Sequence, residues 1–370
     1  MVLLDVIFYT FIVVVFIQVV VYIFLYGKFA FLKQLKEPSK KIPISVIICA
    51  KNEADNLKTF LPYIINQDYP DFEIVLINDA SHDKTLKVMQ SFEKLHENIK
   101  IVDVKSIEAF WGNKKYALTL GIKASKNEYL LFTDADCKPI SNQWIKEMSS
   151  HFNNEKTIIL GYGSYSKIKK SFLNKLIRFE TLVTAINYFS LAKLGTPYMG
   201  VGRNLAYTKK EFFNANGFIK HIKVRSGDDD LFINQIANKT NTAICFSKES
   251  FTESNPKPAF KDWFRQKRRH VSTANHYKLK HKILLAHIYS LQFLFWILSI
   301  ILIMATFKLQ IVASLILFRI ILQYVIFGNS SKKLGEIDLL ILLPFLEIFL
   351  LFTQLTIFIN NLVSKPNYWK

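Results

Sequence analysis

Apolar residues are concentrated in long runs at the two ends of the chain, whereas the middle mixes apolar and polar positions. Four runs stand out, at residues 2–26, 283–307, 309–327 and 339–363. A helix of roughly 20 apolar residues crosses the ~30 Å hydrocarbon core of a bilayer. The pattern therefore predicts four transmembrane helices, one before and three after a polar middle.

The first run has the features of an anchor that stays on the protein. A secretory signal peptide has a positively charged start, a shorter apolar core and a small-residue cleavage site. Here Asp5 stands near the start, where no early Lys or Arg occurs, and Lys28 follows the run. We therefore expect an uncleaved transmembrane helix.

Two charged residues stand inside the C-terminal apolar runs, Arg319 in the third run and Glu347 in the fourth. A charge at membrane depth is costly unless it is paired or led to water. An ion pair between the two helices is one solution, and access to water is the other.

Basic residues gather beside the apolar runs, and the formal net charge of the chain is +19. The residues that follow the first run and precede the second are Lys33, Lys36, Lys40, Lys41, Lys261, Arg265, Lys267, Arg268, Arg269, Lys278, Lys280 and Lys282. Because positive flanks mark the cytoplasmic side, residues 28–282 and a second loop at Lys332 and Lys333 are expected in the cytoplasm, with both termini outside. Cations in this position indicate an anionic membrane surface as partner and no nucleic acid.

The middle of the chain alternates short β-branched runs with helical patterns. Strands are expected at 45–49, 73–77, 99–104 and 129–133, and helices at 53–66, 83–95 and 114–124. Continuous apolar strands are typical of a parallel sheet with helices on both faces. The predicted fold class is α/β, a mostly parallel doubly wound sheet with its ligand at the carboxyl ends of the strands, joined to transmembrane helices.

Residues 171–194 carry apolar positions at helical spacing together with Lys175, Arg178 and Lys193. Such a segment can lie as an amphipathic helix at the bilayer surface. A buried core helix is the equally open alternative.

The three cysteines, Cys49, Cys137 and Cys245, lie far apart and form no C-x-x-C pair. This spacing argues against a disulfide scaffold or a zinc site. Reduced, buried thiols in a cytosolic domain are expected instead.

Acidic residues follow two of the predicted strands at the edge where a ligand would bind. Asp79 ends the second strand, where its carboxylate could accept hydrogen bonds from a base or a ribose, while Ser81 or Asp83 could cap the next helix. Asp134 and Asp136 follow the fourth strand. Two carboxylates separated by one residue can share a divalent cation that neutralises a leaving diphosphate.

Three successive carboxylates, Asp228 to Asp230, precede a hydrophobic helix. Adjacent like charges raise one another's pKa, which suits a general base. The alternative is an acidic first turn that is favoured by the helix dipole. Further along, the cations of 266–270 could approach a pyrophosphate or flank a membrane helix.

Together these segments resemble glycosyltransferase family 2, whose members are inverting nucleotide-sugar enzymes with a GT-A fold. Each segment is a weak signal alone, but the set follows the family's order from residue 45 to residue 269. The matching segments are 45–53, 78–83, 112–117, 133–136, 202–206, 227–230 and 266–269.

The resemblance implies roles for the residues around the donor. Glu53 and Asp79 would lie around the nucleoside, and Lys114 would approach the diphosphate. Asp134 would face the ribose or the donor sugar. Asp136, with Asp134 beside it, would hold Mg²⁺ or Mn²⁺.

The resemblance also implies roles on the acceptor side. Asp229 is expected to be the base that deprotonates the acceptor hydroxyl, with Asp228 as the second choice. Gln266 and Arg269 would border the acceptor channel and the diphosphate. The acceptor oxygen would attack the anomeric carbon in line, which inverts its configuration.

Two positions depart from the family pattern. Asn78 stands where the family often has a first aspartate, although Asp79 remains. His270 replaces the tryptophan of the Q-x-x-R-W motif in polymerising members. An indole offers a stacking face to a growing sugar chain, so its absence favours the addition of one or a few sugars, with His270 as a boundary residue.

The sequence thus predicts a metal-dependent, inverting glycosyltransferase in the cytoplasmic membrane. It would move a sugar from a nucleotide-diphosphate sugar, UDP-sugar being the commonest family donor, to a lipid-linked or glycan acceptor of the cell envelope. A processive polysaccharide synthase that exports its product and a non-catalytic membrane scaffold are the alternatives. The expected domains are 1–27, a catalytic 28–282 with interfacial helices, and 283–370.

Overall fold

The computed structural model describes residues 2–34, 38, 40–105, 114–224 and 226–364. Lys36 and Gly112, which the sequence interpretation used, lie outside these residues. The chain forms two compact units. We call Met1–Lys33, Ser171–Leu194 and Ala259–Pro366 the helical unit, and Gln34–Lys170 with Gly195–Pro258 the sheet unit. The expected domain boundaries at 27 and 282 remain predictions.

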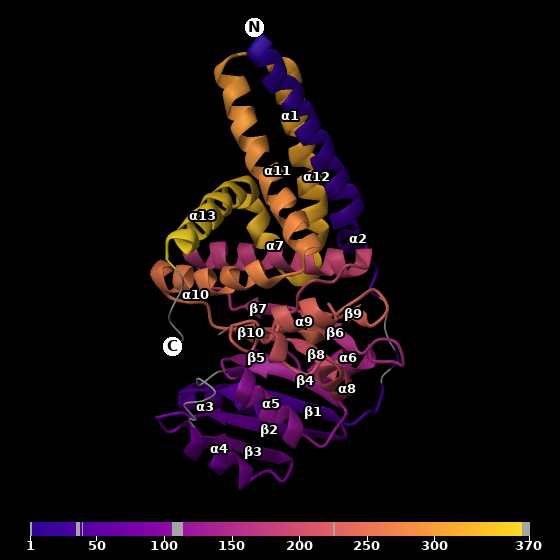
Figure 1. The fold of residues 1–370 in the computed structure, drawn as a ribbon, viewed down its shortest axis with the longest axis vertical. Helices are drawn as coiled ribbons and strands as arrows, with labels where there is room; N and C mark the ends of the chain where they lie inside the picture. Colours follow the sequence, from indigo (N-terminus) through magenta and orange to yellow (C-terminus); the bar gives the residue numbers. More distant parts are fainter. Residues whose placement is uncertain (1, 35–37, 39, 106–113, 225, 365–370) are drawn as a thin grey trace. The chain divides into compact units, whose positions relative to one another are not determined.

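The sheet unit contains a seven-stranded sheet in the order β3-β2-β1-β4-β8-β6-β9 (Figure 1). β1 (Ile44–Ala50) pairs in parallel with β2 (Phe72–Asp79) and with β4 (Tyr129–Asp134). β2 pairs in parallel with β3 (Ile99–Val104). The four predicted strands are therefore confirmed, and their carboxyl ends meet at one edge of the sheet.

Helices cover both faces of these strands, as the doubly wound fold requires. Alternate residues of a strand face opposite sides. On one face Val46, Ile48 and Leu76 lie in a buried core with residues of three helices, which are α3 (Ala54–Ile65), α4 (Thr85–Glu93) and α6 (Trp144–Ser150). On the other face α5 (Lys114–Ala124) comes so close that a Cβ on Gly121 would lie 2.1 Å from Ile77 Cδ1.

The remaining strands are short, and the sequence did not predict them. β8 (Leu205–Thr208) is antiparallel to β4 and to β6 (Ile158–Leu160), and β6 pairs in parallel with β9 (Thr242–Ile244). A second sheet has the order β5-β10-β7, formed by Cys137–Pro139, Thr252–Ser254 and Gly163–Tyr165. The short helices between them are α8 (Lys209–Asn214) and α9 (Asp230–Ile236), with 3-10 turns η3 (Ile219–His221) and η4 (Lys248–Ser250). Strands of three or four residues are too short to show a sequence period.

The helical unit contains the four predicted apolar helices. Within the described residues, four stretches are long and apolar enough to cross a membrane, namely Val2–Ala30, Leu279–Met304, Leu309–Leu334 and Ile337–Val363. The first stretch comprises α1 (Val2–Val20), the π-helical η1 (Val21–Tyr26) and α2 (Gly27–Ala30). The second and third stretches are α11 (Leu279–Met304) and α12 (Leu309–Leu334). The fourth comprises η6 (Ile337–Leu342) and α13 (Leu343–Val363). These helices indicate a membrane protein.

Polar contacts define the two ends of this unit. Lys308, before α12, lies 3.3 Å from Asp5 Oδ1 in the first turn of α1. Lys333 in the last turn of α12 donates to the Phe29 carbonyl at 2.6 Å. Helix α12 therefore runs in the same direction as α1, and α11 lies beside them in the opposite direction (Figure 1).

Two further helices pack at the end that Phe29 and Lys333 mark. α7 (Phe172–Leu194) reaches it through a hydrogen bond from Tyr26 Oη to Asn187 at 3.0 Å. α10 (Phe260–Thr273) lies beside α7 through the Lys267–Glu180 ion pair, and the 3-10 turn η5 (Ala274–His276) leads from it to α11. Most of α7 is buried, which favours the packed-helix interpretation of residues 171–194.

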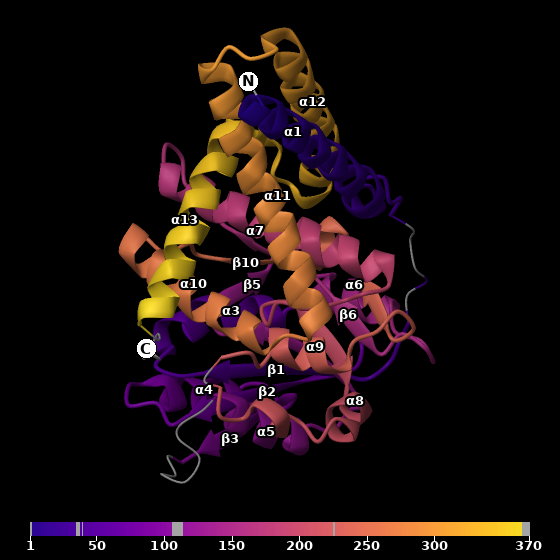
Figure 2. The same ribbon diagram turned by 45° about the horizontal axis from the view of Figure 1, so that its top comes forward.

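Helix α13 takes a different path from the predicted fourth crossing. Arg178 of α7 donates to Glu336 at 2.9 Å, just before the segment begins. Arg268 of α10 donates to the carbonyls of Asn360 and Ser364 at its end. Figures 1 and 2 both show α13 descending to α10 instead of following α12. The expected crossing with an external C-terminus is therefore not the path these contacts describe. Arg178 attaches the start of the segment to α7 and Arg268 attaches its end to α10, and an apolar run does not reveal such distant polar partners.

Of the two solutions left open for Arg319 and Glu347, the structure shows the ion pair. The Arg319 guanidinium is fully buried and donates to both carboxylate oxygens of Glu347, at 2.7 and 3.0 Å. Gln18 of α1 accepts a third hydrogen bond from Arg319 at 2.9 Å. The charge is thus paired inside the helical unit, and the cluster joins α1, α12 and α13.

Candidate active site

Hydrogen bonds connect the turns after β1 and β2 and fix the carboxyl edge of the sheet. The Asn52 amide donates to Ser81 Oγ at 3.0 Å, and the His82 amide donates to Asn52 Oδ1 at 2.9 Å. Asp83 accepts from the Thr85 amide at the start of α4. Of the two predicted capping residues, Asp83 therefore binds the start of α4, whereas Ser81 binds the turn after β1.

Asp79 lies at the end of β2 with its side chain almost fully buried. Burial raises the pKa of its carboxyl group, and the positive charges of Lys51 and Lys114 partly offset this effect. Lys51 Nζ lies 4.0 Å from Asp79 Oδ2. Asp79 is thus a carboxylate at the ligand edge, as the sequence predicted.

A hydrogen bond to the neighbouring strand accounts for asparagine at position 78, where the family often has an aspartate. The Asn78 amide nitrogen donates to Asp103 Oδ1 on the neighbouring strand at 2.7 Å. An aspartate at this position would place a second negative charge against Asp103. The amide therefore fits this sheet better than a carboxylate.

Asp134 and Asp136 form the acidic pair that was predicted after β4. Oxygen atoms of the two carboxylates and Cys137 Sγ all lie within 4.8 Å of one another. Burial raises the pKa of Asp136, and the negative charges of Asp134 and Glu53 raise it further. A cation would relieve this repulsion, and two carboxylates are the hard oxygen ligands that Mg²⁺ and Mn²⁺ prefer.

Cys137 has another partner. Its sulfur lies 2.9 Å from Ser254 Oγ, and burial raises the pKa of the thiol well above its usual range. A buried neutral thiol is a poor ligand for a hard cation. The expectation of a buried, reduced cysteine is met at this position.

Lys114, the first residue of α5, joins the acidic pair to the later acidic cluster. Its Nζ lies 2.8 Å from Asp134 Oδ1 and 3.0 Å from Asp228 Oδ2. Burial alone would lower the pKa of the ammonium group, but the carboxylates of Asp134 and Asp228 outweigh it and hold the pKa well above its usual range. This cation is therefore fixed at the centre of the site.

Lys115 supports the site in a way that the sequence did not indicate. Its fully buried ammonium group donates to the carbonyls of His221 and Val224, at 2.8 and 2.9 Å. Burial lowers its pKa to about 8. Lys115 thus holds the segment before Asp228 against α5, although a lysine in a helical pattern usually indicates a solvated face.

Asp228 and Asp229 point to different partners. Asp229 caps α9, accepting from the Asp230 amide at 2.7 Å and from the Gly202 amide at 2.7 Å. The acidic-turn interpretation is therefore confirmed for Asp229. Asp228 instead reaches Lys114.

The environment of Asp229 raises the pKa of its carboxyl group to about 7, chiefly through burial and then through the charges of Asp228 and Asp230. The folded protein therefore retains a proton between pH 4 and 7 that the unfolded chain releases, so this group's contribution to stability falls as the pH rises through that window. Compared with Asp229→Asn, the wild type should be relatively more stable at pH 5 than at pH 8. Thermal unfolding of both proteins at the two pH values measures this difference, and an unchanged gap would contradict it.

Arg203, in the matching segment 202–206, is a further cation that the sequence interpretation left without a role. Its guanidinium donates to the Gly163 carbonyl at 2.8 Å and lies over the Tyr165 ring, 4.2 Å from the centroid. Its charge lowers the pKa of Asp136. Arg203 therefore supports the acidic pair.

The sheet unit brings together seven of the nine predicted site residues, which are Glu53, Asp79, Lys114, Asp134, Asp136, Asp228 and Asp229. They lie at the ends of β1, β2 and β4 and at the starts of α5 and α9. Gln266 and Arg269 belong to α10 in the helical unit. Their predicted roles remain predictions.

Comparison with known proteins supports this interpretation. The sequence profile of Glycosyl transferase family 2 matches residues 45–217. An uncharacterised glycosyltransferase of Haemophilus influenzae is 33% identical over 127 residues, which are 34% of this chain and 37% of that protein. A poly-β-1,6-N-acetyl-D-glucosamine synthase of Staphylococcus epidermidis is 34% identical over 93 residues, covering 25% of this chain and 21% of that protein. The chain thus spans well under half the length of these relatives.

A solved structure extends the likeness beyond the matched domain. The mannosyltransferase PcManGT of Pyrobaculum calidifontis, in complex with GDP-Man and Mn²⁺, has a TM-score of 0.58 at 16% identity. The match covers 91% of this chain and 96% of that one. It establishes a GT-A fold together with helices outside the sheet. The profile match over residues 45–217 and the acidic residues in the expected places support a glycosyltransferase family 2 domain in this chain.

Proposed function

We propose that the chain transfers a sugar from a nucleotide-diphosphate sugar to a membrane-associated acceptor, with inversion at the anomeric carbon. One observation carries the proposal. In a family 2 domain, Lys114 joins Asp134 of the acidic pair to Asp228 of the later cluster, at 2.8 and 3.0 Å. Groups suited to a diphosphate and to an acceptor hydroxyl are thereby gathered around one cation.

The donor side uses residues at the strand ends. Glu53 and Asp79 bind the nucleoside, and Asp136 with Asp134 holds Mg²⁺ or Mn²⁺. The metal supplies charge neutralisation for the diphosphate. Lys114 exchanges its carboxylate partners for the incoming diphosphate, which frees Asp228. The neighbour that contains GDP-Man supports a nucleotide-sugar donor, and UDP-sugar stays a prediction.

We assign the base to Asp228 in preference to Asp229, which reverses the order expected from the sequence. Each oxygen of Asp229 already accepts a backbone hydrogen bond at 2.7 Å. Asp228 makes its ion pair with Lys114, next to Asp134. Asp229 then positions the turn that presents Asp228.

The reaction balances with these groups. The acceptor oxygen attacks the anomeric carbon while its proton passes to Asp228. The bond between that carbon and the diphosphate oxygen breaks, and the nucleoside diphosphate leaves with the electron pair. Attack from the opposite side inverts the configuration.

The membrane context supports an acceptor that is lipid-linked or delivered at a membrane. Four described helices are long and apolar enough to cross a bilayer. Lysines lie before α11 and at the end of α12, so the positive-inside rule supports a cytoplasmic position for the sheet unit.

Asp136→Ala tests the enzymatic proposal. Purified protein in detergent is incubated with a panel of nucleotide sugars and Mn²⁺, and nucleotide release is measured. The wild type should turn over one donor, and the variant should lose roughly 100-fold or more, because a carboxylate ligand is removed. Asp55→Ala, on the exposed surface of α3, is the matched control.

The same experiment separates a transferase from a scaffold. A folded wild type that releases nucleotide from no donor, and whose cellular role survives Asp136→Ala, would support a scaffold. A processive synthase is favoured by the relative from Staphylococcus epidermidis, but His270 still argues against it. Product length from one donor distinguishes the two transferase modes.

A further inference from the structure

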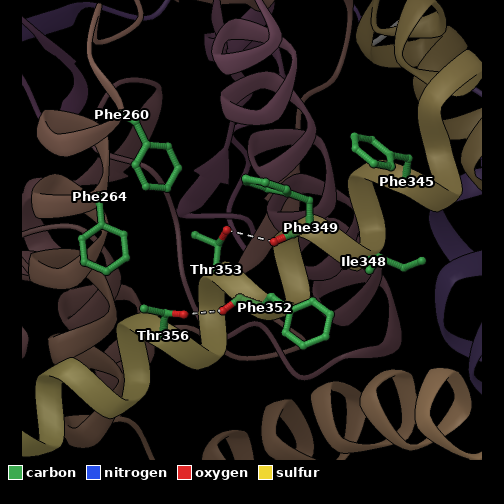
Figure 3. A pocket seen from close by; sticks show the side chains of 8 residues that line it. All are labelled: Phe260, Phe264, Phe345, Ile348, Phe349, Phe352, Thr353 and Thr356. Carbon is green, nitrogen blue, oxygen red and sulfur yellow. Dashed lines mark hydrogen bonds between the residues drawn. The ribbon is translucent and has the colours of Figure 1, made fainter.

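An apolar groove of about 320 Å³ lies within the helical unit between α10 and α13. Phe260 and Phe264 form the α10 wall, one helical turn apart (Figure 3). The α13 wall consists of Phe345, Ile348, Phe349, Phe352, Thr353 and Thr356. Volumes of roughly 300–1,000 Å³ are typical of sites that bind small molecules.

The groove is suited to hydrocarbon and not to sugar. Its lining has two polar side chains, and both hydroxyls donate to carbonyls of α13 itself, Thr353 to Phe349 at 2.9 Å and Thr356 to Phe352 at 2.8 Å (Figure 3). No lining side chain is therefore left to donate a hydrogen bond to a polar ligand. A flexible alkyl chain needs no such partner.

Cations stand directly beside the phenylalanines. Lys261 and Arg265 follow Phe260 and Phe264 in sequence, are one helical turn apart, and are exposed. Within the described part of the chain they make no ion pair. One face of α10 thus offers an aromatic wall next to two available positive charges, which matches an amphiphile with an apolar chain and an anionic head.

The contacts of α10 place this groove at the basic end of the helical unit. Arg268 joins α10 to the end of α13, and Lys267 joins it to Glu180 of α7. The same end carries Lys332 and Lys333. Anionic lipids attract basic segments at such a surface.

We propose that this groove holds one acyl chain of an anionic phospholipid, with Lys261 and Arg265 facing its phosphate. The site is separate from the donor chemistry, since none of its residues belongs to the sheet unit. An experiment that contradicts the lipid site would therefore leave the transferase proposal unchanged.

Photo-crosslinking of proteoliposomes tests the site. The probes are phosphatidylglycerol and phosphatidylcholine with the same diazirine-bearing acyl chain, and labelled positions are mapped by peptide mass spectrometry. Labelling at 260–264 and 345–356 is divided by labelling of exposed α1 residues, which serve as the reference for non-specific lipid contact. Phosphatidylglycerol should label the groove preferentially.

Two variants fill the groove from its exposed rim, Thr356→Trp and Phe352→Trp, and Ile359→Trp is the control on an exposed position of α13 outside the lining. Each filling variant should lower the groove ratio by roughly fivefold or more, because the apolar surface that the chain would cover is lost. Gel filtration and thermal unfolding establish that the variants fold, and two independent fillers keep the test valid if one does not.

The head group is tested separately. Lys261→Glu with Arg265→Glu should reduce the phosphatidylglycerol preference to that of phosphatidylcholine, a loss of roughly fivefold for each cation. Lys280→Glu with Lys282→Glu, exposed at the start of α11, should retain it. Unchanged labelling in both filling variants would overturn the chain site and leave the groove to a protein helix or to solvent. Equal labelling by the two lipids would overturn the anionic assignment.

Discussion

Asp228→Asn is expected to lower the transfer rate by about 10²–10⁴-fold while donor binding changes little, because a positioned base contributes about that much. The substitution keeps the size of the side chain but removes the acceptor for the hydroxyl proton. It also removes the ion pair between Asp228 Oδ2 and Lys114 Nζ, which lie 3.0 Å apart. Nucleotide release and sugar transfer in membranes that contain the native acceptor measure kcat and the donor KM separately.

Asp229→Asn is the matched comparison, one residue away. Its amide oxygen can still accept from Gly202, but its NH₂ group cannot accept from Asp230, so the cap of α9 is weakened. Losing a cap costs about 0.5–2 kcal/mol, and the transfer rate should fall far less than in Asp228→Asn. The opposite ranking, with Asp229→Asn nearly inactive and Asp228→Asn active, would return the base to Asp229.

Most of the sheet could be predicted because its central strands are long and apolar. β1, β2 and β4 each have six to eight residues, most of them buried, so their composition alone indicates buried parallel strands. β6 and β9 have three residues each, and only the pairing of β6 with β8 and of β9 with β6 makes them strands. Local sequence contains no such information.

The site could be predicted as far as chemistry follows from position at a strand end. Asp79, Asp134 and Asp136 were found in this way. The role of Lys115 could not be predicted, because it depends on the His221 carbonyl that the fold brings to α5. The different roles of Asp228 and Asp229 could not be predicted either, because they depend on the Gly202 and Asp230 amides that bind Asp229. The path of α13 was missed for the same reason, since it depends on Arg178 and Arg268.

Glu347→Ala is expected to destabilise the helical unit by about 3–5 kcal/mol, because it leaves a buried guanidinium without its carboxylate. Arg319 is 0% exposed and donates two hydrogen bonds to Glu347. The Trp296 indole, which donates to the same carboxylate at 3.2 Å, loses its partner as well. The unfolding midpoint in detergent should fall by roughly 10 °C, since each kcal/mol moves it by about 2–4 °C in domains of 150–250 residues.

The double substitution Arg319→Leu with Glu347→Leu distinguishes an unpaired charge from lost packing. With both charges replaced by apolar groups, most of the stability should return, because a buried ion pair and a hydrophobic pair of similar volume are often close in energy. Gln18 keeps its hydrogen bond to the Leu291 carbonyl at 2.7 Å in this variant. If the double variant is as unstable as Glu347→Ala, the cluster acts through its geometry at the start of α13 and not through charge compensation. If Glu347→Ala alone is as stable as the wild type, Arg319 has access to water, which was the alternative that its position in an apolar run left open.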